Sequence, residues 1–173
     1  MDITGVYDLT SVKVYDNSSL GSESLAEIAF TTHAKWDTTG DGNDTGGNFT
    51  YTDSAGVGTL TQTSANMAIS GVGNRWYKFV YTITSSTGDC AATITTGFAT
   101  AATALTLTNG TNTTYVHSKA SPGNFVISVT STTGGFIMDN VTLKILNTAA
   151  VNYAIGIREL ASFDSSRITV IST

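Results

Sequence analysis

The stretch "GGFIMDNVTLKILN", residues 134–147, decides the fold class. Its apolar side chains return at alternate positions, which is the spacing of a β-strand with one buried face. The apolar face expected from this spacing consists of Ile137, Val141, Leu143 and Ile145. Asp139 interrupts that face, and the Asp139–Asn140 pair is expected to organise the strand entry through side-chain hydrogen bonds to the backbone. The stretch is therefore expected to close a β-domain.

The same alternation recurs along the rest of the chain. "WYKFVYTIT", residues 76–84, sets Tyr77, Phe79, Tyr81 and Ile83 on one face, and "NFVISVTST", residues 124–132, does the same for Phe125, Ile127 and Val129. Turn-forming stretches such as "TTGDGNDTGG" (38–47) and "SPGN" (121–124) separate the runs. Many short strands with frequent turns predict an all-β protein, an antiparallel β-sandwich of jelly-roll type. Only "GSESLAEIAF", residues 21–30, allows a helix, and it is equally compatible with an extended chain.

Composition and charge exclude several classes of protein. Only 12% of residues are charged, the net charge is −5, and lysines and arginines are scattered singly, so no nucleic-acid partner is expected. No apolar run reaches about 18 residues, so no membrane span is expected. The N-terminal segment lacks the pattern of a secretory signal. The single cysteine, Cys90, is expected to be a small buried or half-buried thiol rather than a redox group.

Five segments between residues 23 and 146 resemble the carbohydrate-binding-module-like β-sandwich domains of bacteriophage tail and virion proteins, and loosely the galactose-binding-type jelly rolls. They are "AEIAFTTHAKWDTTGDG" (26–42), "GGNFTYTDSAGVGTLTQT" (46–63), "GNRWYKFVYTIT" (73–84), "NGTNTTYVHSKASPGNFVISVTST" (109–132) and "GGFIMDNVTLKIL" (134–146). The last segment, with its Asp-Asn-Val closing strand, is the most specific. The resemblance implies the sandwich fold more firmly than any function, because one scaffold hosts many roles.

The resemblance divides the chain into three parts. Residues 1–22 are expected to form an N-terminal arm with a strand, residues 23–146 the sandwich, and residues 147–173 a C-terminal arm with a strand. Neither arm can bury its apolar strand alone, and an uncovered strand edge is a liability. The two strands are expected either to pair with each other or to add to neighbouring subunits.

Two groups of side chains are candidates for binding. Trp76, Arg75 and Tyr115 are the candidates for carbohydrate binding, because an aromatic ring can stack on the apolar face of a sugar. Trp36, by contrast, is expected in the core. The oxygen-rich loop containing Asp37, Asp41, Asn43 and Asp44 is either a solvated loop or a structural calcium site.

No catalytic constellation stands out in the sequence. Nothing marks the pair of carboxylates that glycoside hydrolysis requires, and the G-x-S-x-G nucleophile motif is absent, so the protein is not expected to be an enzyme and needs no catalytic cofactor.

The favoured expectation for function is a bacteriophage virion structural protein, either a capsid decoration (cement) protein or a tail or fibre subunit. It would be assembled in the host cytoplasm and contact copies of itself and other virion proteins through β-structure. The alternative is a carbohydrate-binding adhesion module that recognises host or mucus glycans.

Overall fold

The computed structural model describes residues 14–32, 34–44, 46–52, 56–148 and 168–170. Within these ranges the regular structure is entirely β, and no helix is long and apolar enough to cross a membrane. The chain divides into a sandwich unit, Ser22–Ile145, and a terminal unit formed by the segments on either side of it. The strands are β1 (Val14–Glu23), β2 (Asp37–Thr39), β3 (Gly42–Asn43), β4 (Phe49–Tyr51), β5 (Gly56–Gln62), β6 (Trp76–Thr87), β7 (Ala91–Ile94), β8 (Thr103–Ala104), β9 (Gly110–His117), β10 (Phe125–Ser131), β11 (Gly135–Thr148) and β12 (Ile168–Val170).

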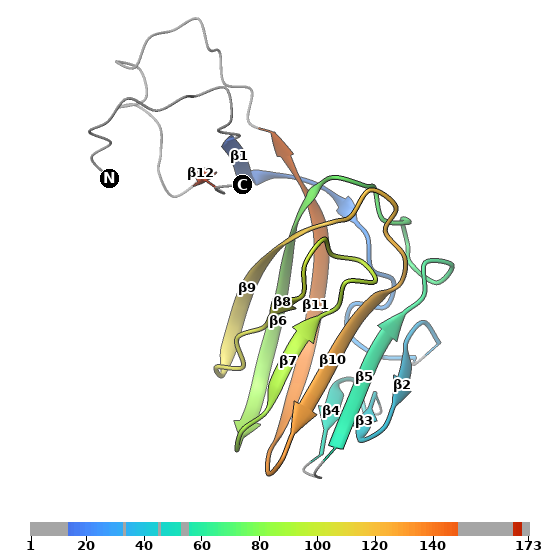
Figure 1. Cartoon of the computed structure of the whole chain (residues 1–173), viewed down its shortest axis with the longest axis vertical. Helices are drawn as coiled ribbons and strands as arrows, with labels where there is room; N and C mark the ends of the chain where they lie inside the picture. The colour runs from blue at the N-terminus through green and yellow to red at the C-terminus, as the bar shows by residue number, and fades with distance from the viewer. Residues whose placement is uncertain (1–13, 33, 45, 53–55, 149–167, 171–173) are drawn as a thin grey trace, which may run out of the picture. The chain divides into compact units, whose positions relative to one another are not determined.

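Two antiparallel sheets form the sandwich unit (Figure 1). One contains β9, β6, β11, β4 and β3, with β6 between β9 and β11. The other has the order β2-β5-β10-β7-β8. Neighbouring strands in these sheets are often far apart in sequence, as in the pairing of β5 with β10, which is usual in a jelly roll. The predicted all-β antiparallel sandwich is confirmed.

The core between the sheets is a chain of aromatic rings. Tyr77, Phe79 and Tyr81 point inward from β6, as their alternation predicted, and none has any exposed surface. Phe98 lies 5.1 Å from Tyr77 between ring centroids, and Phe125 of the opposite sheet lies 5.4 Å from Phe98 and 5.3 Å from Phe79. These tilted and edge-to-face contacts join the two sheets.

Buried tyrosine hydroxyl groups fasten loops to this core. The hydroxyl of Tyr77 accepts the amide of Val72 (2.7 Å) and donates to its carbonyl (3.2 Å). The hydroxyl of Tyr81 accepts the amide of Thr106 (2.8 Å) and donates to its carbonyl (3.0 Å). Burial is the largest influence on the pKa of both hydroxyls and raises it, so both stay protonated and able to donate.

Trp36 is also part of the core, as predicted. Its side chain is 4% exposed, packs against Phe30 with a centroid separation of 5.4 Å, and donates its indole N–H to the carbonyl of Glu27 (3.0 Å). A buried tryptophan whose N–H is satisfied in this way has a structural role.

In strand β11, the residues that face the core differ in part from those predicted. Asn140 has a φ of 50°, and the register with β6 shifts between Asp139 and Thr142. The extra residue reverses the alternation, so that Phe136 and Met138 face the core before the bulge and Val141 and Leu143 face it after the bulge. Ile137 therefore lies on the outer face, contrary to the prediction. The Asp139 carboxylate does accept the amide of Asn140 (2.7 Å), but this contact forms the bulge inside the strand rather than the strand entry.

The segment 21–30 contains no helix. Glu27 and Phe30 both have positive φ values, 56° and 51°, which a right-handed helix does not allow. The segment is instead held by long-range contacts: the Gln62 side chain donates to the carbonyl of Ala26 (2.7 Å) and accepts its amide (2.9 Å). Tertiary hydrogen bonds thus override the weak helical pattern.

The terminal unit contains the extra strands expected from both ends of the chain. β1 pairs antiparallel with β12, with Val14 opposite Val170 and Asp16 opposite Ile168. Of the two expectations for these strands, pairing within one chain is the one observed. Residues 1–13, 149–167 and 171–173 of the two arms lie outside the described residues.

Asp89 fastens together two turns at one end of the sandwich. Its carboxylate accepts the amides of Thr132 (3.0 Å) and Thr133 (2.9 Å) and the hydroxyls of Ser131 (3.0 Å) and Thr132. These hydrogen bonds, that from the Thr132 hydroxyl foremost, hold the pKa of Asp89 well below its usual range. The preceding Gly88 has a φ of 71°, and a Cβ there would collide with the carbonyl of Thr133, so the close approach of the two turns requires glycine.

Acid should therefore weaken the fold through Asp89. Because its folded-state pKa is depressed, the stabilisation is complete above the unfolded pKa of about 4 and is lost progressively as the pH falls further. Asp89→Asn should lower the urea midpoint at neutral pH and flatten its dependence on pH below about 4. Asp37→Asn, at an exposed edge-strand position, is the control. An unchanged acid profile in Asp89→Asn would contradict this assignment.

Tyr77→Phe should destabilise the protein while leaving its fold intact. The ring contacts remain, but the amide and carbonyl of Val72 lose their partner, which costs about 1–3 kcal/mol for buried polar groups. Denaturant unfolding monitored by circular dichroism measures this free energy. Tyr77→Leu, which also removes the ring, should cost more, and a Phe variant as stable as the wild type would show that water replaces the hydroxyl.

Candidate functional site

The outer face of β6 begins with a tryptophan and a lysine. Because side chains alternate along a strand, burying Tyr77 and Phe79 turns Trp76 and Lys78 to the opposite face. Both side chains are half-buried. Trp76 therefore belongs to the surface of the sandwich, whereas Trp36 belongs to its core.

Strand β9 brings two more rings to the same face. In the β6–β9 register, Trp76 lies opposite His117 and Lys78 lies opposite Tyr115. Residues directly opposite in an antiparallel pair point to the same side of the sheet, and their diagonal neighbours are about 7–8 Å apart. The ring centroids of Trp76 and His117 are 5.0 Å apart, with an interplanar angle of 57°. Trp76, His117 and Tyr115 thus line one end of this face.

Strand β11 and the turn before β6 add positive charge. Lys144 lies opposite Lys78 in the β6–β11 register, so a row of Lys144, Lys78 and Tyr115 crosses three strands. Arg75 is exposed at the start of β6, where its amide donates to the buried hydroxyl of Ser118 (3.0 Å). We call Arg75, Trp76, Lys78, Tyr115, His117 and Lys144 the aromatic–basic cluster.

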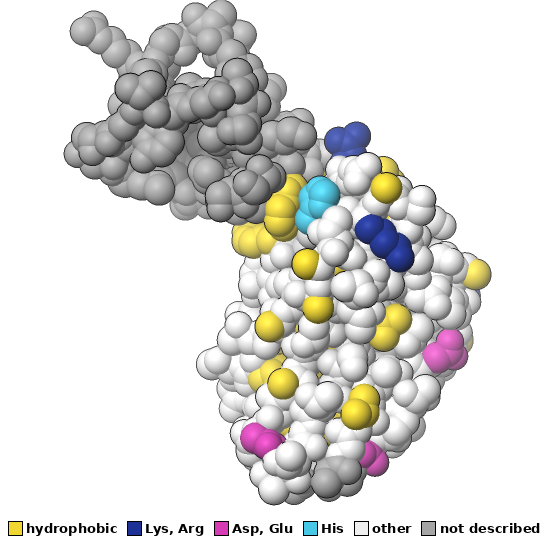
Figure 2. Space-filling view, in the orientation of Figure 1, with side chains coloured by type: hydrophobic (Ala, Val, Ile, Leu, Met, Phe, Trp, Pro, Cys, Tyr) yellow, Lys and Arg dark blue, Asp and Glu magenta, His cyan; other side chains and the backbone are white. Residues whose placement is uncertain are grey.

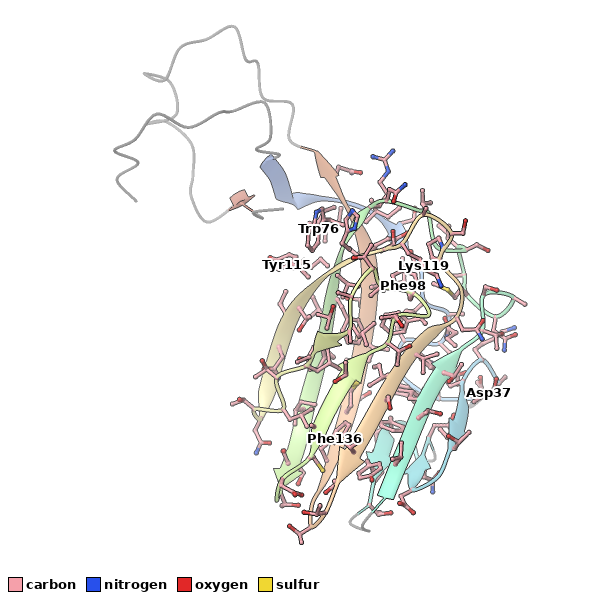
Figure 3. The ribbon with its side chains drawn as sticks, viewed as in Figure 1. Asp37, Trp76, Phe98, Tyr115, Lys119 and Phe136 are labelled. Atoms are coloured by element: carbon pink, nitrogen blue, oxygen red, sulfur yellow. The ribbon has the colours of Figure 1, made fainter. Side chains whose placement is uncertain are left out.

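The three residues predicted for sugar binding lie close together. Trp76 and Tyr115 are diagonal neighbours on one face, at the same end of the sandwich (Figure 3), and Arg75 adjoins Trp76 in the chain. Sequence reasoning did not select His117, Lys78 and Lys144 for the site. The alternation of residues 76–84 already turned Lys78 outward, but nothing local indicated which residues of β9 and β11 lie beside it.

The four residues of the predicted solvated loop or calcium site lie on β2, in the β2–β3 turn, on β3 and directly after β3. Asp37 is exposed on β2 of one sheet, Asn43 is exposed on β3 of the other, and Asp44 is buried. Figure 3 shows Asp37 well away from Trp76 and Tyr115. Asp41 lies in the turn between β2 and β3, where its carbonyl accepts the amide of Thr52 (3.3 Å). Among the described residues, no three His, Cys, Asp or Glu side chains form a group that could hold a metal ion.

The chemistry available to the aromatic–basic cluster is binding. Its rings offer apolar faces of the size of a sugar ring, and its cations offer hydrogen-bond donors at their rim. The cluster contains no carboxylate, whereas glycoside hydrolysis uses a pair of them. An open, half-buried patch of this kind suits recognition of an extended or flexible ligand.

Comparison with known proteins gives fold similarity only. No protein-family model matches the chain, and no curated protein matches it. One similar solved structure is the enzymatically active domain of tailspike protein 4 of bacteriophage CBA120, with 17% identity and a TM-score of 0.46 over 71% of this chain and 21% of that one.

Two further similar structures contain carbohydrate-binding modules. TmCBM61, in complex with β-1,4-galactotriose, is 15% identical with a TM-score of 0.42 over 71% of this chain and 98% of that one. The CBM22-1–GH10 modules of the Clostridium thermocellum endo-1,4-β-D-xylanase 10B, complexed with xylohexaose, are 14% identical with a TM-score of 0.44 over 82% of this chain and 30% of that one. At low identity, the chain is thus similar to solved structures that include carbohydrate-binding modules and a domain of a phage tailspike protein.

Proposed function

We propose that this protein is a non-enzymatic carbohydrate-binding module of a bacteriophage virion, serving adhesion to glycans of the host or its surroundings. The observation that carries the proposal is the juxtaposition of Trp76, His117 and Tyr115 on the outer face of β6 and β9. Core packing does not require these rings on that face, because the core is already filled by the inward residues of the same strands. Trp76 and Tyr115 stack on sugar rings in this proposal, and Arg75 donates hydrogen bonds to their hydroxyl groups.

A second candidate function is that of a virion structural subunit, as capsid decoration or as part of a tail or fibre. It is favoured by the outer face of the sheet β2-β5-β10-β7-β8. The three central strands of this sheet, β5, β10 and β7, carry no charged side chain on that face. The outward residues of β5, β10 and β7 are Val57, Thr59, Thr61, Val126, Ser128, Thr130, Ala91 and Thr93. Figure 2 views this face. Most of its side chains are uncharged, and the charged ones lie at its margins. Such a face suits packing against a second copy of the chain.

The first proposal predicts that Trp76→Ala abolishes glycan binding without unfolding the protein. Screening on a glycan array, followed by calorimetry with the best ligand, should show a loss of at least tenfold in affinity, about 1.4 kcal/mol. Trp76→Phe should retain part of the affinity, because a ring still covers the sugar. Thr82→Ala, farther along the same face of β6, is the matched control. A folded wild-type protein that binds no glycan, or a Trp76→Ala variant that binds as well as the wild type, would contradict the proposal.

The second candidate predicts that Ser128→Lys disrupts assembly. A lysine at the centre of the uncharged face would have to be desolvated when two copies pack, which is costly. Light scattering should then show oligomers for the wild type and monomers for Ser128→Lys. Thr113→Lys, on the outer face of the other sheet, should leave assembly unchanged. A wild-type protein that is strictly monomeric and has no affinity for any virion particle would exclude this role.

A further inference from the structure

The fold concentrates positive charge that the sequence scatters. The structure describes five lysines and arginines, and all of these except Lys35 lie at the Trp76 end of the sandwich: Arg75, Lys78, Lys119 and Lys144. Lys119 reaches this end because its carbonyl accepts the amide of Asn74, next to Arg75 (3.2 Å). Figure 2 shows lysine, arginine and histidine side chains together at one end of the sandwich unit. A chain with a net charge of −5 thus has a locally basic end.

None of the acids in the described sandwich forms an ion pair with these four cations. Glu23, at the end of β1, lies beside β11: its carboxylate accepts the amides of Leu25 (3.0 Å) and Leu143 (2.7 Å) on the side of β11 away from β6. Asp139 lies opposite Thr82, about 13 Å along the strand from Lys78 at 3.3 Å per residue. Asp89 lies beyond the other end of β6.

The cations also lie where a ligand on the aromatic rings would meet them. Lys78 follows Trp76 on the outer face of β6 and stands opposite Tyr115, so it shares one face of the sheet with both rings. Lys144 continues the row on β11, and Arg75 directly precedes Trp76 in the chain. A sugar ring stacked on Trp76 would therefore lie on the same face of the sheet as Lys78 and Lys144.

We infer that the ligand is an acidic saccharide, one whose sugar rings carry carboxylate groups, such as a uronate or sialate oligomer. This inference rests on the proposed glycan-binding function and adds the class of glycan. Lys78 and Lys144 pair with carboxylates on the rings that stack on Trp76 and Tyr115, and Arg75 can bind a further carboxylate through two parallel hydrogen bonds. A carboxylated sugar fits better than nucleic acid, because the cations flank rings in a compact patch and the acidic chain as a whole repels a long polyanion.

The test compares each acidic oligosaccharide with its own methyl ester, which keeps the sugar and removes the charge. Tetragalacturonate, an oligomer of sialic acid and their methyl esters are titrated into the full chain by calorimetry. The acids should bind about tenfold more tightly than their esters, since charge-assisted contacts are the stronger ones. Raising the salt from about 0.05 M to about 0.5 M should weaken binding of the acids and leave binding of the esters unchanged.

Charge-removing variants locate the effect. The double variant Lys78→Gln/Lys144→Gln should lose most of the preference for the acid over its ester and most of the salt dependence, the remainder being the contribution of Arg75. Lys35→Gln, which removes the described lysine outside this end, should behave as the wild type. Trp76→Ala should lose both ligands, which separates the stacking contribution from the charge contribution.

Dextran sulfate, dextran and a thymidine oligonucleotide distinguish the other sources of negative charge. Tighter binding of dextran sulfate or of the oligonucleotide than of any carboxylated sugar, independent of Trp76, would overturn the inference. Equal, Trp76-dependent binding of acids and esters, or of neutral glycans alone, would overturn the acidic preference and leave the glycan-binding function standing. Absence of binding to every saccharide, in a folded protein, would overturn both.

Discussion

The strict alternation of side chains along β6 is the constraint on which the rest of the structure depends. Tyr77, Phe79 and Tyr81 must all face inward to join the two sheets, and the hydroxyl groups of Tyr77 and Tyr81 hold two loops. A slip of one residue would exchange the two faces of the strand completely. Turning the core residues inward therefore fixes Trp76 and Lys78 outward with the same precision. The position of Trp76 and Lys78 in the aromatic–basic cluster is therefore a geometric consequence of the core.

The alternation of apolar residues predicted which side chains face the core in those strands where the alternation is uninterrupted. The inward faces of β6 and β10 are the expected ones, because nothing disturbs the period of two over residues 77–83 of β6 or within β10. In β11 the prediction was wrong before Asn140, at Ile137, and right after it, at Val141 and Leu143, since a bulge with positive φ reverses the alternation and the sequence did not mark that one residue as extra. The weak helical pattern of residues 21–30 was overridden by the Gln62 side chain, 36 residues away from Ala26.

The candidate site was predictable only in part, for a related reason. Trp76 and Tyr115 were chosen for their chemistry, one residue at a time. Their proximity follows from the register of β6 with β9, and the presence of Lys144 follows from the register of β6 with β11. Register between strands distant in the chain depends on the whole core, so it cannot be inferred from either strand alone. Scattered cations in the sequence therefore gave no sign of the basic end that the fold creates.

The two outer faces of the sandwich differ so much that the proposed glycan binding and the proposed assembly would use different surfaces. One face presents aromatic rings and cations, while the central strands of the other present threonine, serine, valine and alanine. An open aromatic patch holds a sugar weakly, because little of the ligand is buried. Packing through the uncharged face would hold several such patches in one particle, and linked sites raise the overall affinity by factors of about 10² to 10⁴ without any new contact. A module that binds weakly alone would thus bind firmly as part of a virion.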